Sequence, residues 1–81
     1  MAIKNEKIEG SLIINEYVSS NIMSSVYDRE KKDLQVMFKG GRKYVYEKVP
    51  MHIFTKMRLS ESQGKYFNKE ISRKYRYKEI K

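Results

Sequence analysis

The chain has 81 residues, of which 40% are hydrophobic and 35% are charged, and it contains no cysteine. This length predicts one small domain, and the lack of cysteine excludes disulfide and thiolate–metal scaffolds. The net charge of +8 and the short apolar runs favour a soluble, cytoplasmic protein with an anionic partner over a membrane or secreted protein.

The positive charge is concentrated towards the C-terminus. Residues 65–81 contain seven Lys or Arg and two Glu, a balance of +5, whereas residues 1–20 contain two Lys and three Glu, a balance of −1. This asymmetry indicates an anionic partner at one end of the molecule. Surplus lysine that serves solubility alone is the alternative.

The N-terminal residues differ from the rest of the chain. Residues 1–10 are polar and predict a flexible tail, and residues 11–81 predict a single domain. In "SLIINEYV" (11–18) apolar residues occupy both sets of alternating positions, which predicts a strand with two partly apolar faces. Such a strand needs a cover, so a homo-oligomer formed through it is one expectation.

A β-meander is the clearest feature of the sequence. Strands are expected over residues 22–28, 34–38 and 43–49, separated by the polar "REKKD" and by "KGGR". A two-residue turn at Gly40-Gly41 would place Val36 opposite Val45, whereas a three-residue loop with a glycine bulge would place it opposite Tyr46. We prefer the bulge, because it gathers one apolar face from Leu34, Val36, Phe38, Tyr44 and Tyr46.

Two helices are expected after the meander. Pro50 lacks an N–H for a ladder and suits the start of a helix over residues 51–59, whose apolar side comprises Ile53, Phe54 and Met57. Ser62 is a good N-cap for a last helix that runs to about Tyr75. Its core stripe comprises Phe67, Ile71 and Tyr75. The predicted fold is therefore α+β: a small antiparallel three- or four-stranded meander followed by two short helices packed on one face.

The last helix also predicts a basic face. Cations repeat at a helical spacing on the side opposite the core stripe, and tyrosines lie beside them. Cations neutralise phosphate and aromatic rings stack on bases, so the face predicts RNA or DNA binding. The expected nucleic-acid-binding residues are Lys65, Tyr66, Lys69, Arg73, Arg76 and Tyr77.

Catalysis is not expected. The only histidine, His52, would lie in the first turn of a helix, and no spacing places a nucleophile or carboxylate beside it. One histidine without cysteine argues against a metal site, and the glycines at 40 and 41 are not followed by the Lys-Ser/Thr of a phosphate-binding loop. No cofactor is expected.

The order of several short motifs resembles the KTSC domain family. The motifs are Ser-x-x-Ile, Tyr-Asp, an apolar strand ending in Phe, Gly-x-x-Tyr-x-Tyr-x-x-Val-Pro, and Ser-x-Gly-x-x-Phe-Asn before an Ile. Within residues 17–77 these positions are Ser19, Ile22, Tyr27, Asp28, Phe38, Gly41, Tyr44, Tyr46, Val49, Pro50, Ser62, Gly64, Phe67, Asn68 and Ile71. One departure is "LSES", where a small apolar residue is expected before Ser-x-Gly.

The resemblance implies little chemistry. KTSC domains occur as short stand-alone bacterial and phage proteins and as appendages of some lysyl-tRNA synthetases, and the last setting suggests RNA contact. The resemblance implies no catalytic residue. It also suggests a small pocket for an anionic ligand, formed by Ser19, Ser20, Tyr46, Ser62, Gly64 and Asn68. The alternative function is therefore a small interaction protein that inhibits a host protein or sequesters a nucleotide signal.

Overall fold

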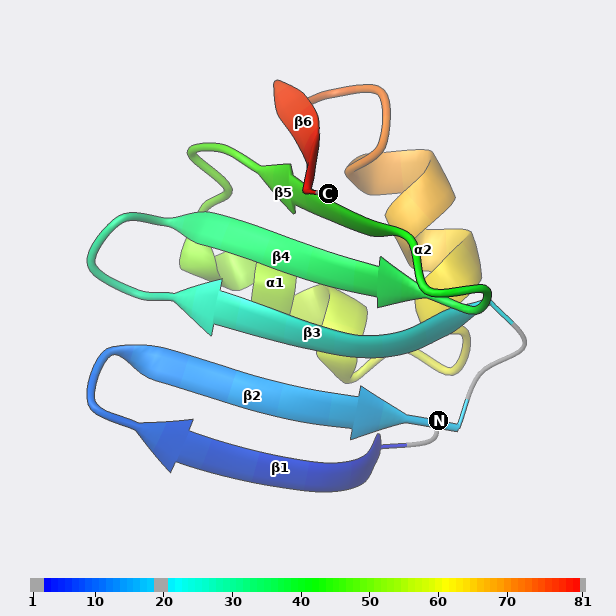
Figure 1. Ribbon diagram of the computed structural model, residues 1–81, viewed down its shortest axis with the longest axis horizontal. Coiled ribbons are helices and arrows are strands. Elements are labelled where there is room, and N and C mark those ends of the chain that lie inside the picture. Colours follow the sequence, from blue (N-terminus) through cyan, green and yellow to red (C-terminus); the bar gives the residue numbers. More distant parts are fainter. Residues whose placement is uncertain (1–2, 19–20, 81) are drawn as a thin grey trace.

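Six strands form one antiparallel sheet in which each strand lies beside the next one in the chain (Figure 1). The structure is a computed structural model, and it describes residues 3–18 and 21–80. In chain order the elements are β1 (Ile3–Glu9), β2 (Leu12–Tyr17), β3 (Ile22–Asp28), β4 (Asp33–Phe38), β5 (Lys43–Tyr46), α1 (Met51–Arg58), α2 (Gln63–Glu70) and β6 (Tyr77–Ile80).

The expected α+β class is confirmed, but the sheet has six strands rather than three or four. The two unexpected strands, β1 and β6, are the edges of the sheet. Residues 3–9, expected to belong to a flexible tail, instead pair with β2 from Ile3–Tyr17 to Glu9–Leu12. Nearly all residues of β1 are exposed, so main-chain pairing rather than burial holds this strand, and its sequence carries no apolar face.

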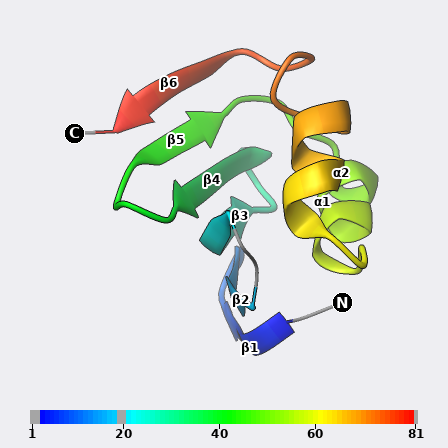
Figure 2. The same cartoon turned by 90° about the vertical axis from the view of Figure 1, so that its right-hand side faces the viewer.

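The core lies between one face of the sheet and the two helices. Both helices cover the same face, and the opposite face carries neither of them (Figure 2). The buried hydrophobic residues are Ile13, Tyr17, Ile22, Tyr27, Leu34, Val36, Tyr46, Val49, Phe54, Met57, Phe67 and Ile71. This core draws on every element except the two edge strands.

The helix starts follow their local signals. Pro50 is the N-cap of α1 with φ −63° and ψ 149°, and Phe54 and Met57 are buried as expected. Ser62 caps α2, because its side-chain oxygen accepts a hydrogen bond from the Lys65 N–H at 3.3 Å.

The hairpin between β4 and β5 has neither of the two expected registers. Val36 lies opposite Tyr44, rather than opposite Val45 or Tyr46. The Phe38 N–H donates to the Arg42 carbonyl at 2.8 Å, and both loop glycines have positive φ, 99° and 91°. The preferred bulge register is therefore wrong by two residues. A shift of two keeps each side chain on its face, so the predicted set of inward-facing residues is correct.

Strand β2 lies inside the sheet. It pairs with β1 on one side and with β3 on the other, so both of its edges are hydrogen-bonded. Residues 11–18 therefore have no free edge for pairing with a second copy, and a homo-oligomer formed through the face of this strand stays a prediction. The free edges belong to β1 and β6.

A partly buried polar network fastens the first hairpin to α1. Glu6 Oε2 accepts hydrogen bonds from the amide of the buried Asn15 at 2.7 Å and from Arg58 Nη1 at 2.8 Å. Between β2 and β3, the hydroxyl groups of Tyr17 and Ser25 are 2.7 Å apart and buried. The network makes β1 part of the domain, although its sequence resembles a tail.

Replacing Glu6 by alanine is expected to lower the free energy of unfolding by about 1–3 kcal/mol, because the buried Asn15 amide and the partly buried Arg58 lose their acceptor. Urea unfolding measures the change. Glu9→Ala is the matched control: its 3.7 Å pair with Lys7 is largely exposed, so its effect should stay below about 0.5 kcal/mol. Equal effects of the two variants would contradict a fastening role for Glu6.

Candidate nucleic-acid interface

The predicted basic face does not lie on one helix. Helix α2 ends at Glu70, where the N–H groups of Ile71 and Ser72 both point to the Phe67 carbonyl oxygen at 2.9 Å. The Ser72 hydroxyl bonds the Asn68 carbonyl at 3.2 Å and competes with continuation of the helix. The expected helix to Tyr75 is therefore wrong, and the chain turns back to form β6 along the free edge of β5.

The structure separates the predicted cations. Lys65 and Lys69 are exposed on α2, Arg73 lies in the following turn, and Arg76 precedes β6. Tyr66 is half-buried, and burial, followed by the nearby Glu70 and Tyr75, raises the pKa of its hydroxyl. Tyr66 therefore packs against the domain and is a poorer stacking surface than expected.

Tyr77 is the exposed aromatic residue of this region. Its ring stacks on Tyr46 with centroids 5.3 Å apart and meets the edge of Tyr44 at 5.7 Å, yet 54% of Tyr77 is exposed. Burial, and then the neighbouring Tyr77 and Tyr44, raises the pKa of Tyr46 to about 12. The Tyr77 ring is thus held in place on one side and open to solvent on the other, as base stacking requires.

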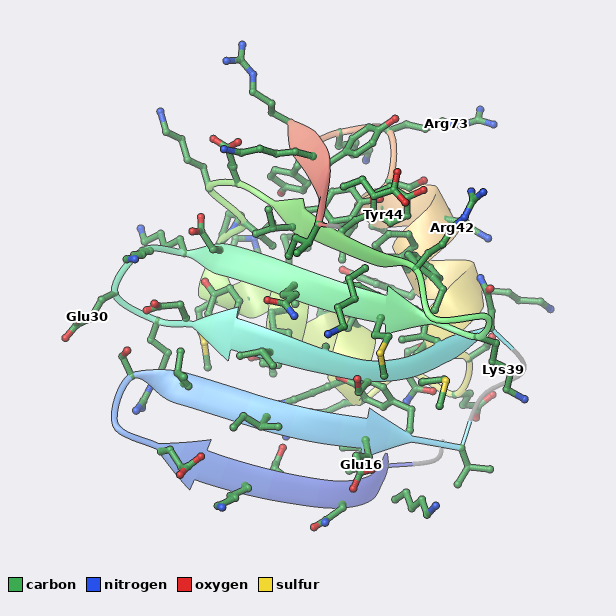
Figure 3. All side chains as sticks on the ribbon, viewed as in Figure 1. Glu16, Glu30, Lys39, Arg42, Tyr44 and Arg73 are labelled. Atoms are coloured by element: carbon green, nitrogen blue, oxygen red, sulfur yellow. The ribbon has the colours of Figure 1, made fainter. Side chains whose placement is uncertain are left out.

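Cations surround this aromatic row. Because side chains alternate along a strand, Arg76 and Lys78 lie on the opposite face of β6 from Tyr77. Figure 3 shows Arg42, Tyr44 and Arg73 on the side of the molecule where α2 meets β5 and β6. The structure therefore places cations on both faces of the strand that carries the open tyrosine ring.

Lysines from three elements gather around Glu70, and sequence reasoning missed two of them. Lys74 Nζ is 3.0 Å from the Glu70 carboxylate. The hydrogen bond and charge of Lys74, followed by the charges of Lys69 and Lys56, hold the pKa of Glu70 below its usual value. The assumption of a longer helix hid Lys74, and no sequence signal places Lys56 beside α2.

The described residues of the expected anion pocket have separate roles. Ser19 and Ser20 lie outside the described residues. Tyr46 is in the core, Ser62 caps α2, and Gly64 is buried where an added Cβ would lie 3.4 Å from the Cβ of Asn21. Asn68 is exposed and its carbonyl accepts the Ser72 hydroxyl. His52 is exposed on α1.

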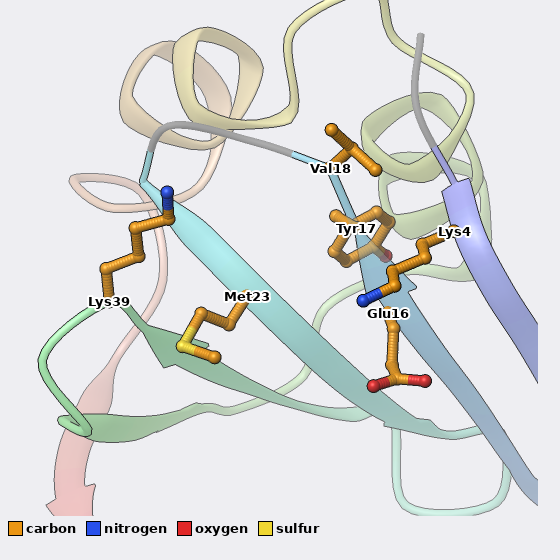
Figure 4. A pocket seen from close by; sticks show the side chains of 6 residues that line it. All are labelled: Lys4, Glu16, Tyr17, Val18, Met23 and Lys39. Atoms are coloured by element: carbon orange, nitrogen blue, oxygen red, sulfur yellow. The ribbon is translucent and has the colours of Figure 1, made fainter.

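A hollow lies beside β1, β2 and β3 (Figure 4). It has a volume of about 280 Å³ and is lined by Lys4, Glu16, Tyr17, Val18, Met23 and Lys39. Val18 and Met23 are exposed apolar residues, and irregular pairing in β1 and β3 adjoins them. Its mixed lining suits a protein side chain better than a phosphate.

Residues 3–18 and 21–80 meet neither the requirements of a metal site nor those of a membrane-spanning helix. Among these residues, no group of three His, Asp or Glu side chains could hold a metal ion. In the same part of the chain, neither helix has the length and apolarity to cross a membrane.

Comparison with known proteins decides the family. The KTSC domain model matches residues 18–75. The chain belongs to the KTSC domain family. A protein of Tsukamurella paurometabola is 33% identical over 58 residues, which cover 72% of this chain and 87% of that protein. The crystal structure of a KTSC domain protein from Yersinia pestis is similar, with a TM-score of 0.80 and 27% identity over 86% of this chain and 99% of that one.

The KTSC match includes part of the candidate interface. It contains β3 to α2 and the turn with Arg73 and Lys74. It does not contain β1 or β6, and therefore lacks Tyr77 and Lys78. In this KTSC domain, the exposed tyrosine is supplied by a segment beyond the matched region.

Proposed function

We propose that this KTSC domain is a non-catalytic, cytoplasmic module that binds single-stranded RNA or DNA along β6. The observation that supports this most is Tyr77, whose ring rests on Tyr46 and Tyr44 and keeps an open face beside cations. Bases would stack on Tyr77, while Arg76 and Lys78 would contact phosphates. Lys65, Lys69 and Arg73 would extend the phosphate path towards α2.

Fluorescence anisotropy with labelled single-stranded RNA, single-stranded DNA and duplex tests the proposal. With three or four phosphate contacts to a single strand, the log–log slope of affinity against salt should be about −2 to −3. Tyr77→Leu should weaken binding by about 1–3 kcal/mol, because one stacked base is lost. Weaker binding to duplex is expected, because paired bases cannot reach the ring.

Charge variants test whether nucleic acid binds at β6 or is attracted to any basic part of the protein. Replacing Arg76 and Lys78 by glutamine should weaken binding, and the same change at Lys4 and Lys7, on the opposite edge strand, should not. Lys69→Glu with Arg73→Glu tests whether the path reaches α2. No binding at low salt, or equal losses for both edge strands, would refute the proposal.

Protein docking is a second candidate. It is favoured by Val18 and Met23, which are exposed apolar residues beside the hollow of Figure 4. Such binding to a host protein would be saturable and far less sensitive to salt than strand binding. Val18→Asp would abolish it and leave nucleic-acid binding unchanged.

A further inference from the structure

A cationic hollow lies where the segment after β5 meets the segment before β6. We call it the Lys48 hollow; it has a volume of about 320 Å³ and is lined by Glu47, Lys48, Lys74, Tyr75 and Arg76. Its walls are tied together through the main chain, because the Glu47 N–H donates to the Arg76 carbonyl at 2.8 Å. The Val49 N–H is likewise fixed to the Lys32 carbonyl at 2.8 Å.

The charge of the Lys48 hollow favours an anion. Three cations and one carboxylate line it, which leaves a surplus of two positive charges. Lys74 also pairs with Glu70 at 3.0 Å, but 58% of the Lys74 side chain is exposed and such a pair exchanges readily. A ligand with more negative charge than the Glu70 carboxylate can therefore draw Lys74 away from this pair.

The backbone at Lys48 has an uncommon conformation for a lysine. Its φ is +55°, in the left-handed region that favours glycine over other residues. A lysine at this position adopts a conformation that is unfavourable for it, whereas glycine would adopt the same conformation at little cost. Its cation then becomes part of the hollow beside Lys74 and Arg76.

The size and lining of the hollow indicate which phosphate it suits. Ligand pockets span roughly 300–1,000 Å³, so this hollow has room for one nucleotide-sized group. A terminal phosphomonoester carries a charge of about −1.5 to −2 at neutral pH and has three free oxygens, whereas a phosphodiester inside a strand carries one charge and has two. Tyr75, which is half-buried against the core, also lines the hollow, and Glu47 can accept from a sugar hydroxyl.

We propose that the Lys48 hollow binds the terminal phosphomonoester of a nucleic-acid strand whose next bases lie along β6. The inference rests on the proposed function, and the two are joined by sequence: Arg76 lines the hollow and Tyr77 begins β6. The domain would then select strand ends over internal positions. A free nucleoside monophosphate offers the same chemistry from another source.

The test compares strands of about ten nucleotides with a 5′-phosphate, a 3′-phosphate or hydroxyl ends only. One phosphorylated form should bind about tenfold tighter than the hydroxyl-ended strand, the effect of a charge-assisted contact. Calorimetry with a nucleoside monophosphate alone distinguishes the source of the phosphate. That ligand should bind more weakly than the strand and compete with its phosphorylated form.

The decisive variant is Lys48→Gly, with Lys32→Gly as its matched control. Both lysines have a left-handed backbone, with φ of 55° and 59°, but only Lys48 lines the hollow. Lys48→Gly should erase the preference for the phosphorylated end without lowering the melting temperature, because glycine suits that backbone. Lys32→Gly should keep the preference.

The outcomes separate the two proposals. Equal binding of all three strands would overturn the Lys48 hollow and leave strand binding standing. If the nucleoside monophosphate binds and none of the strands does, the result would support the hollow, with a free nucleotide as its ligand, and would overturn the proposed function. No binding of any of these ligands would overturn both.

Discussion

Replacing Phe54 by alanine is expected to lower the free energy of unfolding by about 3–5 kcal/mol, the largest effect of any single change considered. Phe54 is fully buried, and its ring stacks on Tyr27 with centroids 4.6 Å apart and planes 7° apart. The Tyr27 hydroxyl is in turn fixed to the Val49 carbonyl at 2.6 Å. Removing the ring leaves a cavity between α1 and the sheet that these constrained neighbours cannot close.

Thermal and urea unfolding measure this effect. For a domain of this size, each kcal/mol lowers the melting temperature by about 4–8 °C. Met51→Ala, on the same helix but with 40% of the residue exposed, is the matched control and should cost less than about 1 kcal/mol. Similar losses for Phe54→Ala and Met51→Ala would show that α1 does not close the core at Phe54.

Raising the pH from about 9 to about 12 is expected to destabilise the fold by up to about 3 kcal/mol through Tyr17 alone. Burial raises the pKa of Tyr17 to about 12, and the hydrogen bond with Ser25 and the charge of Arg58 only partly oppose this effect. In the unfolded chain the tyrosine ionises near pH 10. The stability from neutral Tyr17 is therefore complete below pH 10 and is lost as the pH rises towards 12.

The control for this prediction removes both hydroxyl groups of the buried pair. Tyr17→Phe with Ser25→Ala leaves no unpaired hydroxyl and should flatten the fall in unfolding free energy between about pH 10 and 12. Lysine deprotonation affects both proteins alike. An identical pH slope in the double variant and the original protein would contradict a neutral, buried Tyr17.

The two edge strands of the sheet differ in the surface that they offer to a partner. Strand β1 alternates lysine with glutamate, and β6 is only four residues long, so neither edge is a long apolar template for another sheet. What distinguishes β6 is the aromatic row beneath it, in which Tyr77 continues Tyr44 and Tyr46. This difference makes β6 the candidate edge for a nucleic acid.

The candidate site could be predicted only in part. The abundance of cations after residue 64 and the choice of Tyr77 as an aromatic contact follow from composition and order. The grouping of Lys48 with Lys74 and Arg76 does not, because Lys48 lies more than twenty residues before the other two and meets them only once β6 pairs with β5. A helix drawn to Tyr75 would have left them unrelated.

The elements that the sequence determined by itself are those with local causes. Alternating apolar residues define β3 and β4, Pro50 marks the start of α1, and the Ser62 side chain caps α2. Each signal lies within a few residues of the element that it creates. The inward face of the β4–β5 hairpin belongs to the same class, because a two-residue change of register preserves it.

Tertiary structure alone decided β1 and β6. Strand β1 has no apolar face, and its place is held by main-chain pairing with β2 and by the contacts of Glu6 with Asn15 and Arg58. Residues 77–80 are equally compatible with the continuation of a basic helix, but the unpaired edge of β5 and the ring of Tyr46 are available to them as a strand. The physical reason is that an edge strand gains its stability from a partner distant in sequence, which no local pattern records.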